Sequence, residues 1–170
     1  MKFLEIFNFW KKFRPQLMEN QIPKEPLKPR LKIDDLPDED YAMVKVSNVG
    51  LTVPFGEGVV LLSSQDGKQF PVSAFSSEVA GYISHFIEQK RDLLPTIYNM
   101  FEQVCEENEL FLVKVKLYKS GQALRANLYF TGKKDLVLRN YRASDAIALA
   151  TFYNTPILIR KSLLEENIPK

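Results

Sequence analysis

Residues 136–159, with the sequence LVLRNYRASDAIALATFYNTPILI, decide the fold of this chain. The apolar residues at their start and end indicate strands over 136–141 and 156–159, and the alanine-rich middle indicates a helix. Ser144 is a natural N-cap for that helix, and the Asp145 carboxylate suits the positive end of the helix dipole. The stretch therefore predicts a strand that turns abruptly into a helix, followed by another strand.

The start of this helix is also a candidate binding site. The guanidinium group of Arg142, the Ser144 hydroxyl and the Asp145 carboxylate meet the N–H groups of a helix N-terminus there, and phosphate sites are commonly built in this way. Helix capping alone also explains Ser144 and Asp145. The residues leave both interpretations open.

The residues on either side of this stretch also alternate between strand and helix patterns. A Gln65-Asp66-Gly67 turn separates two strands, and Ser76 opens a helix whose apolar residues follow the helical repeat. We expect strands over 43–51, 58–63, 69–74, 113–118 and 124–129. We expect helices that begin at residue 76, span 92–107 and begin at residue 162. The first two of these helices are expected to bury their apolar residues, which are Val79, Tyr82, Ile83, Phe86, Ile87, Leu93, Leu94, Ile97, Phe101, Val104 and Cys105.

The hairpin over 113–129 alternates core residues with basic and aromatic ones. A Ser120-Gly121 loop would place Lys116 opposite Arg125, and opposed like charges destabilise a hairpin by up to about 1 kcal/mol unless an anion lies over them. A nucleic-acid backbone supplies such an anion, and tyrosines stack on bases. A solvated basic face is the other interpretation. The predicted nucleic-acid face consists of Lys114, Lys116, Tyr118, Arg125 and Tyr129.

The N-terminal part of the chain is expected to lie outside this domain. Residues 1–15 predict an amphipathic helix that is too polar for a secretory signal or a membrane span. Such a helix folds onto its own core, or contacts a membrane surface or a protein partner. Residues 16–40 are rich in proline and predict an extended linker, which leaves residues 41–170 as the domain.

Composition and charge narrow the class of protein. The chain has 170 residues, 45% hydrophobic and 26% charged, which suits one soluble domain with a tail and excludes a bundle of membrane spans. A single cysteine, Cys105, excludes an internal disulfide and favours the cytoplasm, and a single His85 limits metal sites to carboxylates. The net charge is +2, but the charges are distributed unevenly along the chain. Residues 111–145 contain eight basic and two acidic residues, whereas residues 31–40 contain five acidic residues and one basic residue, Lys32. A basic segment of this kind indicates contact with a polyanion.

Several of these segments resemble a known family. The stretch RASDAIALATFYNTPILIRKSLLEE, residues 142–166, resembles the RPSDAIALA signature, the PI-V strand and the last helix of the bifunctional nuclease domain family. Upstream, Phe70-Pro71-Val72 resembles the family's LPI strand, Glu78 falls where its helix carries a Glu-Ala pair, and Ala126 fits its fyA strand. The order agrees from about Val44 to Leu164.

The resemblance implies an α+β fold, in which a mixed, mainly antiparallel sheet packs with three to four helices. It also implies a homo-oligomer with nuclease activity on DNA and RNA. The positions that match the family's motifs are Glu78, Thr96, Arg142, Ser144 and Asp145.

The chain also departs from the family pattern. Ile97 and Tyr98 stand where the family has a His and an Asp, Asn140 replaces an acid, and Ala143 replaces a proline. Glu78 and Asp145 remain as candidate ligands for a divalent metal, Mg²⁺ or Mn²⁺, in a phosphodiester hydrolase.

Two hypotheses of different classes follow. The first is a metal-assisted nuclease in which Arg142 and Ser144 bind and orient the phosphate and Glu78 and Asp145 hold the metal. The second is a catalytically degenerate module that binds nucleic acid, a protein partner or a membrane surface. Whether Glu78, Arg142 and Asp145 come together in space separates the two.

Overall fold

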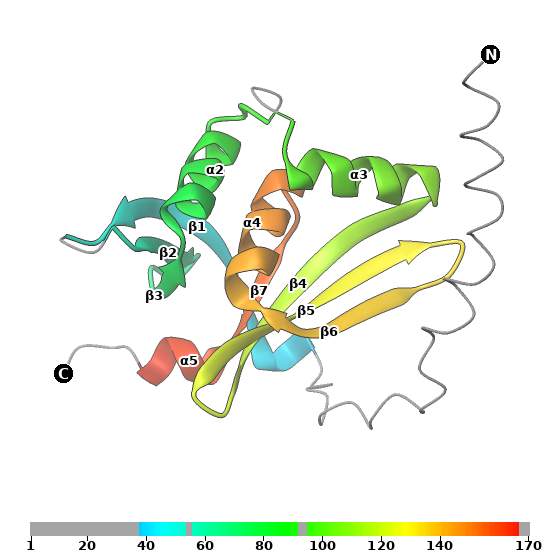
Figure 1. Ribbon diagram of the computed structural model, residues 1–170. Helices are drawn as coiled ribbons and strands as arrows, with labels where there is room; N and C mark the ends of the chain where they lie inside the picture. The colour runs from blue at the N-terminus through cyan, green and yellow to red at the C-terminus, as the bar shows by residue number, and fades with distance from the viewer. Residues whose placement is uncertain (1–37, 54–55, 92–94, 167–170) are drawn as a thin grey trace, which may run out of the picture. The chain divides into compact units, whose positions relative to one another are not determined.

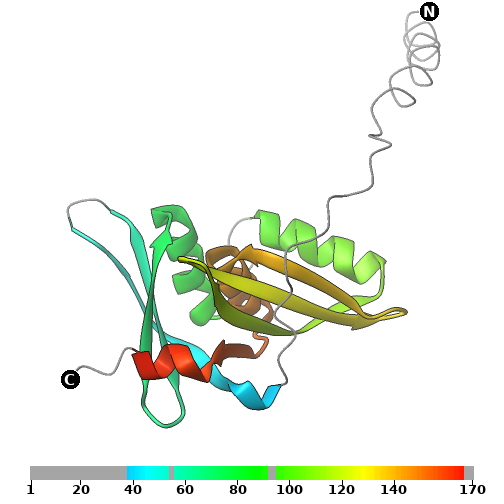
Figure 2. The ribbon, with the colours of Figure 1, turned by 90° about the horizontal axis from the view of Figure 1, so that it is seen from below.

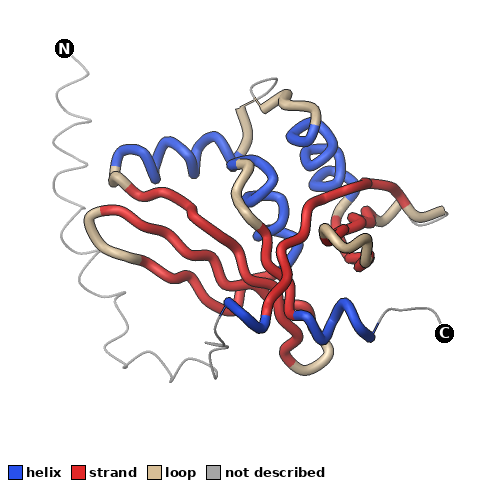
Figure 3. The backbone as a smooth tube through the Cα atoms, turned by 180° about the vertical axis from the view of Figure 1, so that it is seen from behind, coloured by secondary structure: helices blue, strands red, loops and turns tan. Residues whose placement is uncertain are grey.

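A computed structural model describes residues 38–53, 56–91 and 95–166 of the chain. Seven strands in these residues form one sheet in the order β3-β2-β1-β7-β4-β5-β6, in which only the β4–β7 pair is parallel (Figures 1 and 3). The predicted α+β class with a mainly antiparallel sheet is confirmed. The strands are β1 (Tyr41–Leu51), β2 (Gly58–Ser64), β3 (Gln69–Phe75), β4 (Leu110–Ser120), β5 (Ala123–Gly132), β6 (Leu136–Arg142) and β7 (Ile157–Arg160).

The helices pack on this sheet. They are the 3-10 helix η1 (Asp38–Asp40) and the α-helices α2 (Ser77–Ile87), α3 (Ile97–Glu107), α4 (Ala143–Tyr153) and α5 (Lys161–Glu166). Figure 2 shows α2, α3 and α4 along one side of the sheet and η1 and α5 along the other. Both faces of the central strands are therefore covered.

Helix α4 lies at the centre of the core, because alanine and other small residues let it approach the sheet closely. Its buried residues include Ile147 and Phe152, which are fully buried. The ring of Phe152 lies 5.1 Å from the ring of Phe86 in α2 and 5.9 Å from that of Tyr98 in α3, measured between centroids. These aromatic contacts join the three helices of one face.

Helix α2 begins as the sequence predicts. The side chain of Ser76 accepts a hydrogen bond from the backbone N–H of Val79 and so caps the helix. Ile83 and Phe86 are buried, but Ile87, predicted to be buried, is exposed at the last turn. Gly58 in β2 lies against this helix, because an added Cβ there would lie 2.7 Å from the Cβ of Ala80.

Helix α3 starts later than predicted and buries a different face. Thr96 is the N-cap and forms a capping box with Asn99, and Pro95 precedes it, so the helix starts at Ile97 instead of residue 92. The buried stripe runs through Tyr98 and Cys105, which leaves Ile97 and Val104 exposed. The predicted burial of Cys105 is confirmed and that of Ile97 and Val104 is wrong. Leu93 and Leu94 lie outside the described residues.

The β4–β5 hairpin has a different register from the predicted one. Ser120 pairs with Ala123, so the loop is Gly121-Gln122, and Gly121 has the positive φ of 62° that suits its turn position. Lys116 consequently pairs with Asn127, and Arg125 pairs with Tyr118. The predicted opposition of Lys116 and Arg125 is therefore wrong.

The face of the sheet opposite α4 contains a buried charge. The Lys116 side chain is only 5% exposed, and its Nζ lies 2.5 Å from Oδ1 of Asp38 in η1 and 4.7 Å from the ring centre of Tyr41. Because a buried ammonium group is costly unless it is paired, η1 contributes to the fold. The last three residues of the predicted linker, Asp38–Asp40, thus contact the sheet, and the rest of residues 1–40 lie outside the described residues.

We therefore predict that two truncations differ. Deletion of residues 1–37 should leave a cooperatively folding domain, whereas deletion of residues 1–40 removes Asp38 and takes a carboxylate away from buried Lys116. The second deletion should cost a further ~1–3 kcal/mol of unfolding free energy, measured by urea denaturation of both proteins. Loss of folding on deletion of residues 1–37 would show that the predicted N-terminal segment belongs to the core.

Candidate functional site

Two helix N-termini lie near each other on the side of the sheet that α2, α3 and α4 cover. Helices α2 and α4 are in contact and run side by side in the same direction (Figure 1). Each carries one acidic residue in its first turn, Glu78 in α2 and Asp145 in α4. The positive end of each helix dipole stabilises such a carboxylate.

Tyr98 packs where α2, α3 and α4 meet, with its ring against those of Tyr82, Phe86 and Phe152. The residue is 8% exposed, and burial raises the pKa of its hydroxyl to about 12, with further contributions from the charges of Asp145 and Glu78 and from Tyr82. Glu78 and Asp145 lie in the first turns of two helices that are in contact, and the charges of both contribute to this shift. The structure therefore places the predicted site residues Glu78 and Asp145 at the N-terminal ends of two contacting helices, and Tyr98 is protonated at neutral pH.

Glu78 already has a hydrogen-bond partner. Its Oε1 accepts a hydrogen bond of 3.0 Å from the hydroxyl of Tyr82, one helical turn further along α2. This bond raises the pKa of the Tyr82 hydroxyl, because the proton is held by a carboxylate. The ring of Tyr82 lies 5.9 Å from that of Tyr98, edge to face, so Glu78 and the two tyrosines form one cluster.

The other predicted residues lie around Asp145. Its Oδ2 is 4.0 Å from Nε of Arg142, and its Oδ1 accepts a 3.4 Å hydrogen bond from the Ser144 hydroxyl. The side chains of Arg142 and Asp145 are 66% and 58% exposed, so both reach solvent, whereas Ser144 is buried. The N-cap of α4 is Arg142, without a side-chain capping bond, and the predicted capping role of Ser144 is wrong because the helix begins two residues earlier than predicted, at Ala143.

Two arginines lie opposite each other beside this helix start. Arg125 of β5 pairs in register with Arg142 of β6. The end of β6 is fixed by Asn127, whose fully buried Oδ1 accepts hydrogen bonds from the Tyr118 hydroxyl and the Asn140 backbone N–H. Opposed guanidinium groups repel unless an anion lies between them, and Asp145 offsets part of this charge.

The predicted nucleic-acid face of the hairpin is mostly covered. Lys116 and Tyr118 are buried, and Lys114 forms an ion pair of 2.5 Å with Asp38. Tyr129 is half-buried between the lysines, with Nζ of Lys114 5.3 Å from its ring centre. The interpretation of this face as a solvated basic surface is therefore wrong for Lys116 and Tyr118, and its use by nucleic acid stays a prediction. Arg125, which is half-buried, is the residue of this face that pairs in register with Arg142.

The described residues contain no group of three or more His, Cys, Asp or Glu side chains that could hold a metal ion. The carboxylates of Glu78 and Asp145 are the donor type that Mg²⁺ and Mn²⁺ prefer, and an ion held by two carboxylates would take its other ligands from water and from a phosphate. They do not suit a two-metal centre, which needs more carboxylate oxygens.

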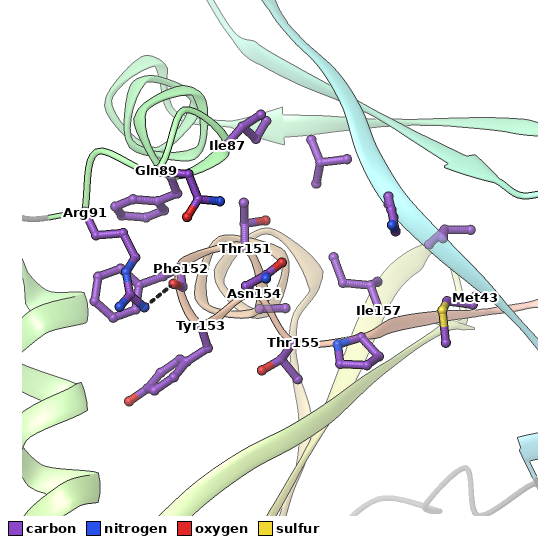
Figure 4. Close-up of a pocket in the computed structure, with 16 residues that line it drawn as sticks. Met43, Ile87, Gln89, Arg91, Thr151, Phe152, Tyr153, Asn154, Thr155 and Ile157 are labelled. Carbon is purple, nitrogen blue, oxygen red and sulfur yellow. Dashed lines mark hydrogen bonds between the residues drawn. The ribbon is translucent and has the colours of Figure 1, made fainter.

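A pocket of about 620 Å³ lies at the opposite ends of α2 and α4 (Figure 4). It is lined by Met43, Lys45 and Ile87, and by the turn after α4, where Arg91 donates a 2.8 Å hydrogen bond to the Phe152 carbonyl. Its described lining contains no carboxylate. The pocket thus lacks the groups that a metal-assisted hydrolase needs.

Sequence reasoning missed three features of this site. The Glu78–Tyr82 bond follows an i, i+4 spacing that was visible in the sequence. The position of Tyr98 and the Arg125–Arg142 pairing depend on tertiary contacts and strand register. No local signal indicated these two features.

Comparison with known proteins agrees with the resemblance. The model of the family described as bifunctional nuclease domain matches residues 59–169, more than half of the chain. A search of curated proteins finds no matching relative. Within residues 38–53, 56–91 and 95–166, no helix is long and apolar enough to cross a membrane.

The raised pKa of Tyr98 predicts a loss of stability in alkali. A raised folded-state pKa means that the stability is complete below the ordinary value of about 10 and is lost as the pH rises through about 12. Between these values wild type should lose up to ~2–3 kcal/mol more than Tyr98→Phe, measured by urea denaturation at pH 8 to 12. Equal losses in both proteins would contradict the placement of the Tyr98 hydroxyl, and the tyrosinate absorbance of wild type supplies the titration itself.

Proposed function

Because the chain belongs to the bifunctional nuclease domain family, we propose that it binds DNA and RNA and hydrolyses their phosphodiester bonds at the cluster formed by Glu78, Arg142, Ser144 and Asp145. One observation carries this proposal. Glu78 and Asp145, far apart in the sequence, lie in the first turns of two contacting helices that run in the same direction, so these two motif positions are at the same end of the helix pair (Figure 1).

The charges of the cluster suit a phosphodiester. Arg142 and Arg125, paired across β5 and β6, provide two guanidinium groups for a phosphate, and arginine matches phosphate geometry well. The N-terminus of α4 adds backbone N–H groups and the positive end of its dipole. Substrate binding would relieve the repulsion between the arginines.

The carboxylates have a separate role. Asp145, which is largely exposed, and the second oxygen of Glu78 would hold a divalent ion, which supplies Lewis-acid polarisation of the phosphoryl oxygen when bound. Tyr98 stays protonated at neutral pH, so it is a hydrogen-bond donor and not a general base. We expect weak turnover, because a two-carboxylate site holds a metal ion less firmly than a complete cage.

One observation favours a second candidate function, that of a binding module without catalysis. In the part of the chain that the structure describes, no third metal-binding side chain joins Glu78 and Asp145, and Ile97 is exposed where the family has a histidine. The arginines and the helix N-terminus would bind nucleic acid equally well without cleavage. Self-association, a cytoplasmic location and a contact through residues 1–15 stay predictions, and the last lies outside the described residues.

Catalysis is tested by neutralising the carboxylates. Cleavage of DNA and RNA with Mg²⁺ or Mn²⁺ should be lost in Asp145→Asn and strongly reduced in Glu78→Gln, because each removes a metal ligand. A lost helix-start charge costs only about 0.3–1 kcal/mol of stability, so thermal melts should show both variants folded. Glu88→Gln, at the other end of α2, is the matched control and should cleave like wild type. Robust cleavage by both site variants would contradict the metal site, and absence of cleavage by folded wild type would favour the binding module.

Phosphate binding is tested separately from cleavage. With a fluorescent single-stranded oligonucleotide in EDTA, Arg142→Gln and Arg125→Gln should each weaken binding and lower the slope of log affinity against log salt by about 0.7. Lys133→Gln is the control, because Lys133 is exposed and paired with Glu109 away from the cluster. Unchanged affinity in both arginine variants would remove the β5–β6 arginines from the site.

A further inference from the structure

The basic face of the β4–β5 hairpin is covered by an acidic segment of the same chain. We define this covered face as Lys114, Lys116 and Tyr129. Residues Asp38–Asp40 of η1 are all acidic, and Asp38 lies over the face. The same face is the one whose lysines and tyrosine predict contact with a nucleic-acid backbone.

Asp38 contacts the lysines as a phosphate would. Its Oδ1 lies 2.5 Å from Nζ of Lys116 and its Oδ2 lies 2.5 Å from Nζ of Lys114, so one anionic group bridges two ammonium groups. These contacts hold the pKa of the Asp38 carboxyl below its ordinary value, since both lysines favour its charged form. The two oxygens are thus used in the way that a phosphodiester uses its non-bridging oxygens.

An aromatic ring adjoins the ion pairs. The Nζ atoms of Lys114 and Lys116 lie 5.3 and 5.5 Å from the ring centre of Tyr129. An anion held between the lysines would therefore bring an attached base within reach of an aromatic platform, which is how sequence-tolerant single-strand sites are built.

Within the residues that the structure describes, the side-chain contacts of the covering segment are the ion pairs of Asp38. The Asp38 side chain is 53% exposed although the Lys116 side chain beneath it is 5% exposed, and Glu39 and Asp40 face solvent. In the described structure η1 has no buried residue. A competing polyanion can therefore approach from the solvent side without first opening the core.

We propose that Asp38 occupies the position of a nucleic-acid phosphate on the covered face, and that single-stranded DNA or RNA binds there by displacing the Asp38–Asp40 segment. The covered face is then a second binding surface, distinct from the Arg125–Arg142 cluster, and its exposure is controlled by the acidic segment. The inference rests on the proposed function for the identity of the ligand as nucleic acid.

The test compares two aspartates of the same 3-10 helix. Asp38→Asn keeps the shape of the side chain and removes the charge that the lysines bind, and Asp40→Asn is the matched control, an exposed residue at the end of η1. Binding of a fluorescent single-stranded oligonucleotide is measured by anisotropy in EDTA at several salt concentrations. Asp38→Asn should bind severalfold more tightly than Asp40→Asn, with a salt slope steeper by about 0.7 to 1.4, because one or two lysines become available to phosphates. Adding Lys114→Gln to Asp38→Asn should reverse most of the gain.

Hydrogen exchange of wild type provides a second measurement that needs no variant. Exchange at residues 38–40 should rise when the oligonucleotide is added, because the segment leaves the face. Equal affinities and slopes in the two aspartate variants, or unchanged exchange with the oligonucleotide bound, would overturn the displacement, as would absence of binding by folded Asp38→Asn. The experiments distinguish failure of this proposal from failure of the proposed function. If the Arg125 and Arg142 variants lose binding and Asp38→Asn has no effect, the proposed site is retained and only the covered face is excluded as a binding surface.

Discussion

The contact of Phe152 with Phe86 and Tyr98 is the interaction on which the rest of the structure depends. Phe152 is fully buried at the end of α4, and the two other rings come from α2 and α3, so one aromatic cluster fixes three helices against the sheet. Because α2 and α4 are fixed at this end, the separation of their N-termini at the other end is also fixed. Glu78 and Asp145 depend on this arrangement for their proximity.

Tyr98 belongs to the aromatic cluster and also interacts with the charges at the N-terminal ends of α2 and α4. Its ring belongs to the aromatic cluster, and the charges of Asp145 and Glu78 contribute to the raised pKa of its hydroxyl. The residue at this position therefore affects both the packing of α3 and the energetic cost of negative charge at the site of Glu78 and Asp145. The family resemblance places an acid here, and a third carboxylate in so buried a position would repel the other two unless a cation were present.

The sequence allowed correct prediction of most elements but not of how they meet. Strand alternation and the Ser76 cap are local signals, and they located β1 to β3 and the start of α2 to within a few residues. The start of α3 was wrong because the Thr96 capping box outweighs the apolar spacing upstream. The predicted register of β4 and β5 was wrong by two residues because Gly121 occupies the first loop position. The burial of Lys116 was not predictable because its partner, Asp38, belongs to a segment whose composition indicated a linker. Of the candidate site, the residue types were found from motifs, while the Tyr98 environment and the Arg125–Arg142 pair arise only from tertiary packing.

Asn140 has a left-handed backbone conformation, with φ of 62°, and its N–H is held by buried Asn127. Asparagine and aspartate are the residues other than glycine that tolerate this conformation best, so the exchange of an acid for an amide leaves the bend at the end of β6 unchanged. The exchange does alter the charge balance of a strand end that also carries Arg139 and Arg142. The exchange thus removes one negative charge from this strand end, while the backbone keeps a conformation that either residue adopts. Divergence of this kind would be invisible in a comparison of folds and would appear only in the ions and ligands that each relative retains.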